Sequence, residues 1–167
     1  MDNRNELQSL AKEYFLARKR FLSAIHKDHP ELGGNDNIVG RIGEFIALQF
    51  LADNKRVVQK CKSATNKGYD IVCSDNRQIS VKTITAESKT GRSTELKQPW
   101  QELIMIYIGE NYVVEKIGHI QIENYNIALS KKEVKANQIA DKKLLIEGGL
   151  FSKHGVLFVG EAVKKYL

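Results

Sequence analysis

The sequence predicts a single α/β domain with a mixed, partly antiparallel sheet that is flanked by helices. Three observations favour this fold class. Residues 1–54 carry apolar side chains at helical spacing, and residues 55–85 contain short apolar runs typical of strands in a hairpin. The chain has 167 residues, a length that suits one domain with a substantial core. We therefore expect the remaining sheet and helices of the same domain in residues 86–167.

Two helices are expected in the N-terminal part. Between residues 4 and 28 apolar side chains recur every three or four positions. Pro30 and then Gly33-Gly34 favour the end of this helix. The residues from Asn35 to Asn37 suit an N-cap, so a second helix is expected to follow them and to run to about Asn54.

Three strands are expected next, over residues 55–61, 69–74 and 77–85. Asp75-Asn76 lies between the second and the third and favours a tight turn. The second and third strands therefore form a hairpin, which we expect to be the core of the domain.

The C-terminal half begins with a polar, basic stretch, residues 87–98, which predicts a loop. Apolar runs over 102–108 and 112–122 predict two strands, with a turn at 109–111.

A further helix is expected after these strands. Ser130 and Glu133 have the spacing of a capping box, and Gly148-Gly149 suits the end of the helix. Residues 156–159 predict a last strand, and a short terminal helix follows it.

Composition excludes several classes of protein. The chain is 42% apolar and 28% charged, which is typical of a soluble globular protein. No apolar run is long enough to span a bilayer, and the first ten residues do not resemble a signal peptide, so we expect a cytoplasmic protein without membrane contact. Cys61 and Cys73 fit no metal-ligand spacing and are expected to be reduced, partly buried thiols.

Positive charge is concentrated between Lys55 and Lys97. That segment holds ten Lys and Arg residues against four Asp and Glu residues, whereas the remainder holds 16 of each, so the segment carries the whole net charge of +6. Such a segment suits a polyanion such as DNA, because Lys and Arg supply sequence-independent affinity for phosphates. A solvated basic surface without a ligand is the alternative.

Glu44 is the one charged residue in a stripe of small and apolar side chains on the second expected helix. A carboxylate in such surroundings is costly to bury unless it meets a cation, a metal or several hydrogen-bond donors. The structural alternative is a buried salt bridge or a carboxylate near the start of the helix.

The expected hairpin carries a second unusual set of polar residues. Ser80 and Lys82 share one face of its second strand, because strand side chains alternate, and Asp70 opens the neighbouring strand. A carboxylate can bind a divalent cation such as Mg²⁺ for phosphodiester hydrolysis, and a lysine can orient the attacking water or neutralise charge on phosphorus. The structural alternative is a cross-strand Asp70–Lys82 ion pair.

These residues resemble the restriction-endonuclease-like PD-(D/E)XK phosphodiesterase superfamily. The resemblance covers roughly residues 37 to 85. It depends on the order of a helix with the sequence GRIGEFIALQFL, a strand, the segment GYDIV, a turn and the segment ISVK. By position, Glu44 matches the helical acid of the family, Asp70 its aspartate and Lys82 its lysine. Ser80 stands where the family usually has Glu or Asp.

The resemblance implies a restriction-endonuclease-like fold and a divalent-metal-dependent endonuclease acting on DNA. Mg²⁺ or Mn²⁺ would be held by Glu44 and Asp70, with Lys82 in a catalytic role. Because a hydroxyl is a poor substitute for a carboxylate on Mg²⁺, two possibilities follow for Ser80. Either Glu44 supplies the second anionic ligand and Ser80 positions a water, or the site has lost its metal and the protein binds DNA or a protein without cleaving. Many such nucleases act as dimers, so a homodimer is compatible with the resemblance.

The remaining candidate residues are those that could contact DNA or another ligand. Lys89, Arg92 and Lys97 are the predicted DNA contacts, because they supply an excess of cations in a polar loop. Trp100, at the end of this loop, is expected in the core, with base stacking as the alternative. The four histidines show no metal spacing and are expected in surface or loop positions. A third class of function is an interaction protein whose basic face meets an acidic partner.

Overall fold

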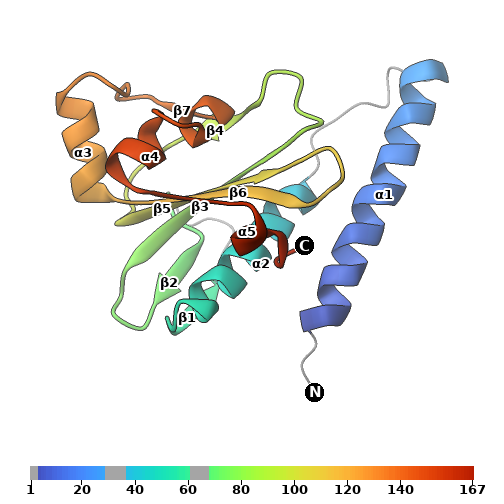
Figure 1. Cartoon of the computed structure of the whole chain (residues 1–167), viewed down its shortest axis with the longest axis horizontal. Coiled ribbons are helices and arrows are strands. Elements are labelled where there is room, and N and C mark those ends of the chain that lie inside the picture. Colours follow the sequence, from blue (N-terminus) through green and yellow to red (C-terminus); the bar gives the residue numbers. More distant parts are fainter. Residues whose placement is uncertain (1–3, 29–36, 61–67) are drawn as a thin grey trace.

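The computed structural model describes residues 4–28, 37–60 and 68–167 and has a mixed α/β architecture. Within these residues a six-stranded sheet lies at the centre, with helices on both of its faces (Figure 1). The strand order is β1-β2-β3-β5-β6-β8. The class predicted from the sequence is therefore confirmed as a mixed sheet flanked by helices.

Both predicted N-terminal helices are present, as α1 (Arg4–Asp28) and α2 (Asn37–Asp53). The turn predicted between them lies outside the described residues. Helix α2 packs closely on the sheet: a Cβ atom added to Gly43 would overlap the Thr83 side chain. The absence of a side chain at Gly43 therefore lets α2 approach the sheet.

The sheet is built from two antiparallel parts joined by one parallel pair. Its strands are β1 (Val58–Lys60), β2 (Ile71–Cys73), β3 (Gln78–Thr85), β5 (Glu102–Ile108), β6 (Val114–Gln121) and β8 (Val156–Val159). Strands β1, β2 and β3 pair antiparallel, β3 and β5 pair parallel, and β5, β6 and β8 pair antiparallel. Because β5 lies at the centre and is covered on both faces, its apolar run is buried almost throughout.

Side chains of the central strands alternate between two apolar layers. Val81 and Ile104 face the layer formed with α1, α2 and the C-terminal helix α5 (Glu161–Lys164). Leu103 and Met105 face the opposite layer, with α3 (Ile122–Ser130) and α4 (Leu150–His154). Trp100 lies in this second layer with 3% of its surface exposed, so it packs in the core and is not available for base stacking.

The stretch predicted as a loop, residues 87–98, contains a short strand. Strand β4 (Arg92–Glu95) pairs with β7 (Ile139–Asp141) in a separate two-stranded sheet. The Arg92 guanidinium also forms an ion pair with the Asp141 carboxylate at 3.0 Å. The sequence RSTE does not alternate between apolar and polar residues, so it does not predict a strand by itself. Its extended conformation depends on pairing with β7, which is distant in the sequence.

The helix predicted to begin at Ser130 is absent, because α3 ends there and a turn follows. The Ser130 hydroxyl donates to the backbone oxygen of Ile127 at 2.8 Å, and the Glu133 carboxylate contacts His154 at 2.7 Å. Both residues of the expected capping box are thus used elsewhere. The segment before Gly148 forms β7 and the short 3₁₀ helix η2 (Lys142–Leu145) instead.

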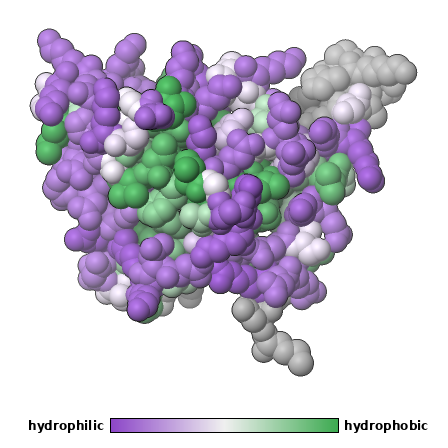
Figure 2. Space-filling model, viewed as in Figure 1, coloured by the Kyte–Doolittle hydropathy of each residue, from purple (hydrophilic) through white to green (hydrophobic). Residues whose placement is uncertain are grey.

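The face of the molecule in Figure 2 is largely hydrophilic and is interrupted by patches of apolar side chains. No helix in the described parts of the chain is long and apolar enough to cross a membrane.

Candidate functional site

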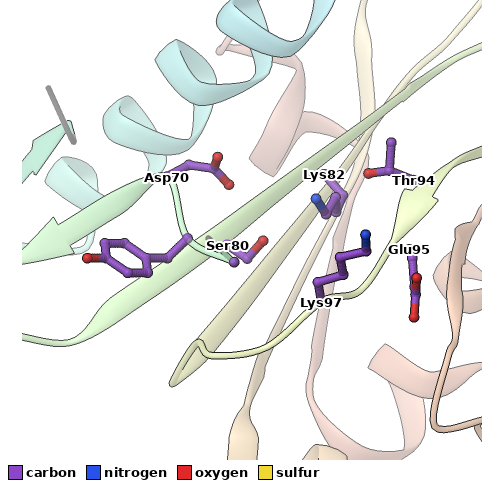
Figure 3. A pocket seen from close by; sticks show the side chains of 8 residues that line it. Asp70, Ser80, Lys82, Thr94, Glu95 and Lys97 are labelled. Atoms are coloured by element: carbon purple, nitrogen blue, oxygen red, sulfur yellow. The ribbon is translucent and has the colours of Figure 1, made fainter. Parts of the chain in front are cut away.

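A pocket of about 420 Å³ opens beside β3, on the side where β2 begins. Asp70, Ser80 and Lys82 line it from the hairpin (Figure 3). Thr94, Glu95 and Lys97 line it from β4 and the segment that follows. The structure therefore brings three of the candidate catalytic residues into one cavity, together with one predicted DNA contact.

The strand register explains this convergence. Ile71 of β2 pairs with Ile79 of β3, which places Asp70 across from Ser80. Ser80 and Lys82 lie opposite Leu103 and Met105 of β5, so both side chains project toward the face away from α2.

The Asp70 carboxylate is held by the backbone of β3. The Asp70 N–H donates to the backbone oxygen of Ile79 at 2.9 Å, and Asp70 Oδ2 accepts the N–H of Val81 at 2.7 Å. At the start of β2, the Asp70 carboxylate thus accepts a β3 backbone N–H as a strand carbonyl would. Oδ1 accepts no hydrogen bond from any described residue, so it remains available to a ligand.

Lys82 is half-buried and Ser80 is 1% exposed, yet neither side chain forms a hydrogen bond or an ion pair with a described residue. The cross-strand Asp70–Lys82 ion pair, which was the structural alternative, is absent from the described contacts. A half-buried ammonium without a counter-ion is costly for a strand to hold. This cost has no structural compensation within the described residues.

Glu44 does not line the pocket. Helix α2 covers the face of β3 that carries Val81 and Thr83, and Gly43, next to Glu44, contacts Thr83. The Glu44 side chain is half-buried. The structure therefore joins Asp70, Ser80 and Lys82 in the pocket and leaves Glu44 out of it.

Sequence reasoning missed Thr94 and Glu95 as pocket residues. Their position depends on the pairing of β4 with β7, for which the local sequence holds no signal. Figure 3 shows Lys97 extending toward Lys82 and Thr94, whereas the Glu95 carboxylate points away from them. The pocket interior is consequently richer in cations than in anions.

The three predicted DNA contacts have different surroundings. Lys89 and Lys97 are both exposed, and Lys97 in addition lines the pocket. The Arg92 guanidinium is paired with Asp141 but remains 56% exposed. Arg92 therefore supports the β4–β7 pair in addition to any contact with a ligand.

A second charged cluster lies away from this pocket, around the buried carboxylate of Glu102. Arg56, Arg77 and His119 contact its two oxygens at 2.5, 3.1 and 2.7 Å. Burial alone would raise the pKa of Glu102, but hydrogen bonds from His119 and Arg56 outweigh this effect and hold the pKa at about 2. The expectation of a surface or loop position was thus wrong for His119, which lies half-buried in β6.

Cys73 lies beside this cluster. The thiol is buried, its Sγ lies 3.0 Å from Arg56 Nη2, and burial raises its pKa. Cys73 is a free thiol as predicted, but it is buried and not partly buried, whereas Cys61 lies outside the described residues.

Among residues 4–28, 37–60 and 68–167, no group of three or more His, Cys, Asp and Glu side chains is arranged to hold a metal ion. A scan against models of known protein families and a search of curated proteins both found no match to this chain.

Proposed function

We propose that this protein is a divalent-metal-dependent endonuclease that hydrolyses DNA phosphodiester bonds, with a restriction-endonuclease-like fold. The supporting observation is the pocket itself, where a backbone-held carboxylate, a hydroxyl and a half-buried ammonium meet, and no described residue forms an ion pair with that ammonium. This combination matches the needs of phosphodiester hydrolysis: an oxygen ligand for a cation and a positive charge beside the phosphate.

The donor set of the pocket fits Mg²⁺ or Mn²⁺. Mg²⁺ keeps several waters and is commonly bound through one or two carboxylates together with substrate phosphates, so a complete protein cage is unnecessary. Asp70 would hold the cation through Oδ1, since Oδ2 is bonded to Val81. Glu44 is the proposed second carboxylate, and it would have to reach the site from the α2 side of β3. A bound cation polarises the phosphate and acidifies a coordinated water.

The residues of the chain would contribute orientation and charge. Lys82 would place its ammonium beside the phosphoryl oxygens, where negative charge increases as water adds to phosphorus and the bond to the leaving oxygen breaks. The Ser80 hydroxyl would orient that water as a hydrogen-bond partner. Lys89, Arg92 and Lys97 would bind phosphates of the DNA backbone, with Lys97 contributing from within the pocket.

The proposal is tested by incubating supercoiled plasmid with the protein and Mg²⁺ or Mn²⁺, with EDTA as the control. We expect nicking or linearisation that EDTA abolishes and that Asp70→Asn removes. Equal cleavage by the native protein and Asp70→Asn would show a contaminating nuclease, and no cleavage with either metal would contradict the proposal.

The second candidate function is a nuclease-like module that binds DNA or a protein without cleaving. Ser80 in place of an acid, and the separation of Glu44 from the pocket, favour this alternative. It predicts metal-independent retardation of DNA in a gel, with no cleavage in the plasmid assay.

A further inference from the structure

We propose that Lys82 and Lys97, with the hydroxyls of Ser80 and Thr94, form a binding subsite for one phosphate group of a nucleic-acid strand. The subsite lies in the pocket beside Asp70 and is built from two segments that are distant in sequence. The inference deepens the proposed function and rests on it for one point, namely that the phosphate belongs to a nucleic acid. Binding of a phosphate group can be tested without cleavage.

The charges of the pocket support an anionic ligand. Neither the Lys82 nor the Lys97 ammonium has a hydrogen-bond or ion-pair partner within the described part of the chain, although the carboxylates of Asp70 and Glu95 line the same pocket. Figure 3 shows Lys97 directed toward Lys82, and the Glu95 carboxylate turned away from both. Two ammonium groups that face one space repel each other, so a bound anion would stabilise the arrangement.

The donors in the pocket favour phosphate among anions. Each ammonium offers three N–H donors, and each hydroxyl offers one more, whereas a phosphate has several oxygens to accept them. Ser80 is 1% exposed, and its hydroxyl bonds no described residue, so a donor directed at the pocket is unused. A pocket of about 420 Å³ has room for a phosphate with its sugar, as expected for one strand that enters the cavity.

The position of Lys97 is fixed by its neighbours on both sides. Leu96 is buried, and its N–H donates to the backbone oxygen of Gln138 at 2.8 Å. Pro99 lies against Gly68, where an added Cβ would come within 2.8 Å of the proline N and O, and Gly68 has a positive φ of 93°. Because Gly68 is only two residues from Asp70, this contact holds the Lys97 segment beside the hairpin.

The experiment is an NMR titration of backbone amides with inorganic phosphate, in EDTA so that no metal takes part. In the native protein we expect shifts that cluster at the pocket, around Val81 and Thr94. Lys97→Ala and Thr94→Val should weaken phosphate binding, and Lys97→Ala should do so by at least about tenfold, because charged hydrogen bonds are lost. Lys131→Ala, which removes an exposed lysine of equal charge from another part of the surface, should stay within about twofold of the native protein.

A second arm repeats the titration with a short single-stranded deoxyoligonucleotide, which should perturb the same amides more strongly than inorganic phosphate does. Equal binding of phosphate by the native protein and Lys97→Ala, or shifts scattered over other basic surfaces, would overturn the inference. If phosphate binds in the pocket but plasmid stays intact with Mg²⁺ and Mn²⁺, the subsite stands and the nuclease proposal fails. If plasmid is cut while Lys97→Ala binds phosphate and oligonucleotide normally, the nuclease proposal stands and the subsite fails.

Discussion

Charged residues of this protein occur in two contrasting surroundings. Glu102 is buried and is contacted by three cationic or potentially cationic side chains, so its charge is fully compensated. Lys82, on a strand of the same sheet, is half-buried with no partner among the described residues. A charge that a fold compensates has a structural role, whereas a charge left uncompensated in a pocket is a candidate for contact with a ligand.

Two substitutions of Asp70 separate the chemical role of its carboxylate from its structural role. Asp70→Asn should abolish metal-dependent cleavage, because the amide loses the negative charge that would hold a cation. Its oxygen can still accept the Val81 N–H, so the melting temperature should change little. Asp70→Ala removes that acceptor and should lower the free energy of unfolding by about 1–2 kcal/mol. Similar large destabilisation by both variants would indicate a purely structural role.

Lys82→Ala should remove turnover while leaving binding of Mn²⁺ to the protein largely unchanged. Thermal stability should hold or rise slightly, because no ion pair with a described residue is broken and a half-buried charge is removed. Calorimetric titration with Mn²⁺ and thermal denaturation measure the two effects. Clear destabilisation by Lys82→Ala would contradict the absence of a structural partner for this ammonium.

The lowered pKa of Glu102 predicts that the folded protein loses stability in acid. Its pKa in the folded protein is about 2, below the ordinary value of 4.5, so its contribution is present above pH 4.5 and is lost as the pH falls toward 2. The full effect is about 3 kcal/mol. Glu102→Gln should remove a similar amount at neutral pH and flatten the fall in stability between these pH values.

Urea denaturation of both proteins at several pH values measures this effect. Glu147→Gln, at an exposed carboxylate, is the matched control and should behave like the native protein. Parallel acid profiles for Glu102→Gln and the native protein would show that the carboxylate does not stabilise the fold.

At the scale of secondary-structure elements, the close approach of α2 to β3 depends on Gly43. Gly43→Ala should lower the free energy of unfolding by about 1–3 kcal/mol, because the new Cβ overlaps the Thr83 side chain and the helix must move outward. Thr83→Ala removes the hydroxyl that would overlap, so the double variant should recover part of the loss. A double-mutant cycle by urea denaturation measures this coupling.

Gly40→Ala is the control for helix propensity, since nothing lies within 4 Å of a Cβ at that position of α2. It should be neutral or stabilising. Destabilisation of equal size at Gly40 and Gly43 would contradict the contact with β3 as the cause.

At the scale of the whole molecule, two apolar layers share one sheet, so we expect them to unfold together. Trp100 reports on the layer beside α3, and amide protection in α2 reports on the other layer. The tryptophan emission and the far-ultraviolet circular dichroism should give one coincident urea transition, and α2 amides should exchange only by global unfolding. Separate transitions would show that the layers are independent.

The sequence alone determined the elements that are marked by their own residues. Helices α1 and α2 could be predicted from apolar residues at helical spacing, and the hairpin of β2 and β3 and strands β5 and β8 from short apolar runs. The alternation of strand side chains also placed Ser80 and Lys82 on one face. The turn at Asp75-Asn76 brought Asp70 beside them.

Tertiary structure alone decided the rest, because the remaining elements depend on contacts between distant segments. Strand β4 exists through its pairing with β7, and the residues expected to cap a helix after Ser130 bond to other groups. The same long-range pairing brought Thr94 and Lys97 to the pocket, and the packing of α2 on the opposite face of β3 left Glu44 outside it. Local periodicity specifies which face of an element is buried, whereas only packing between elements determines which polar residues meet.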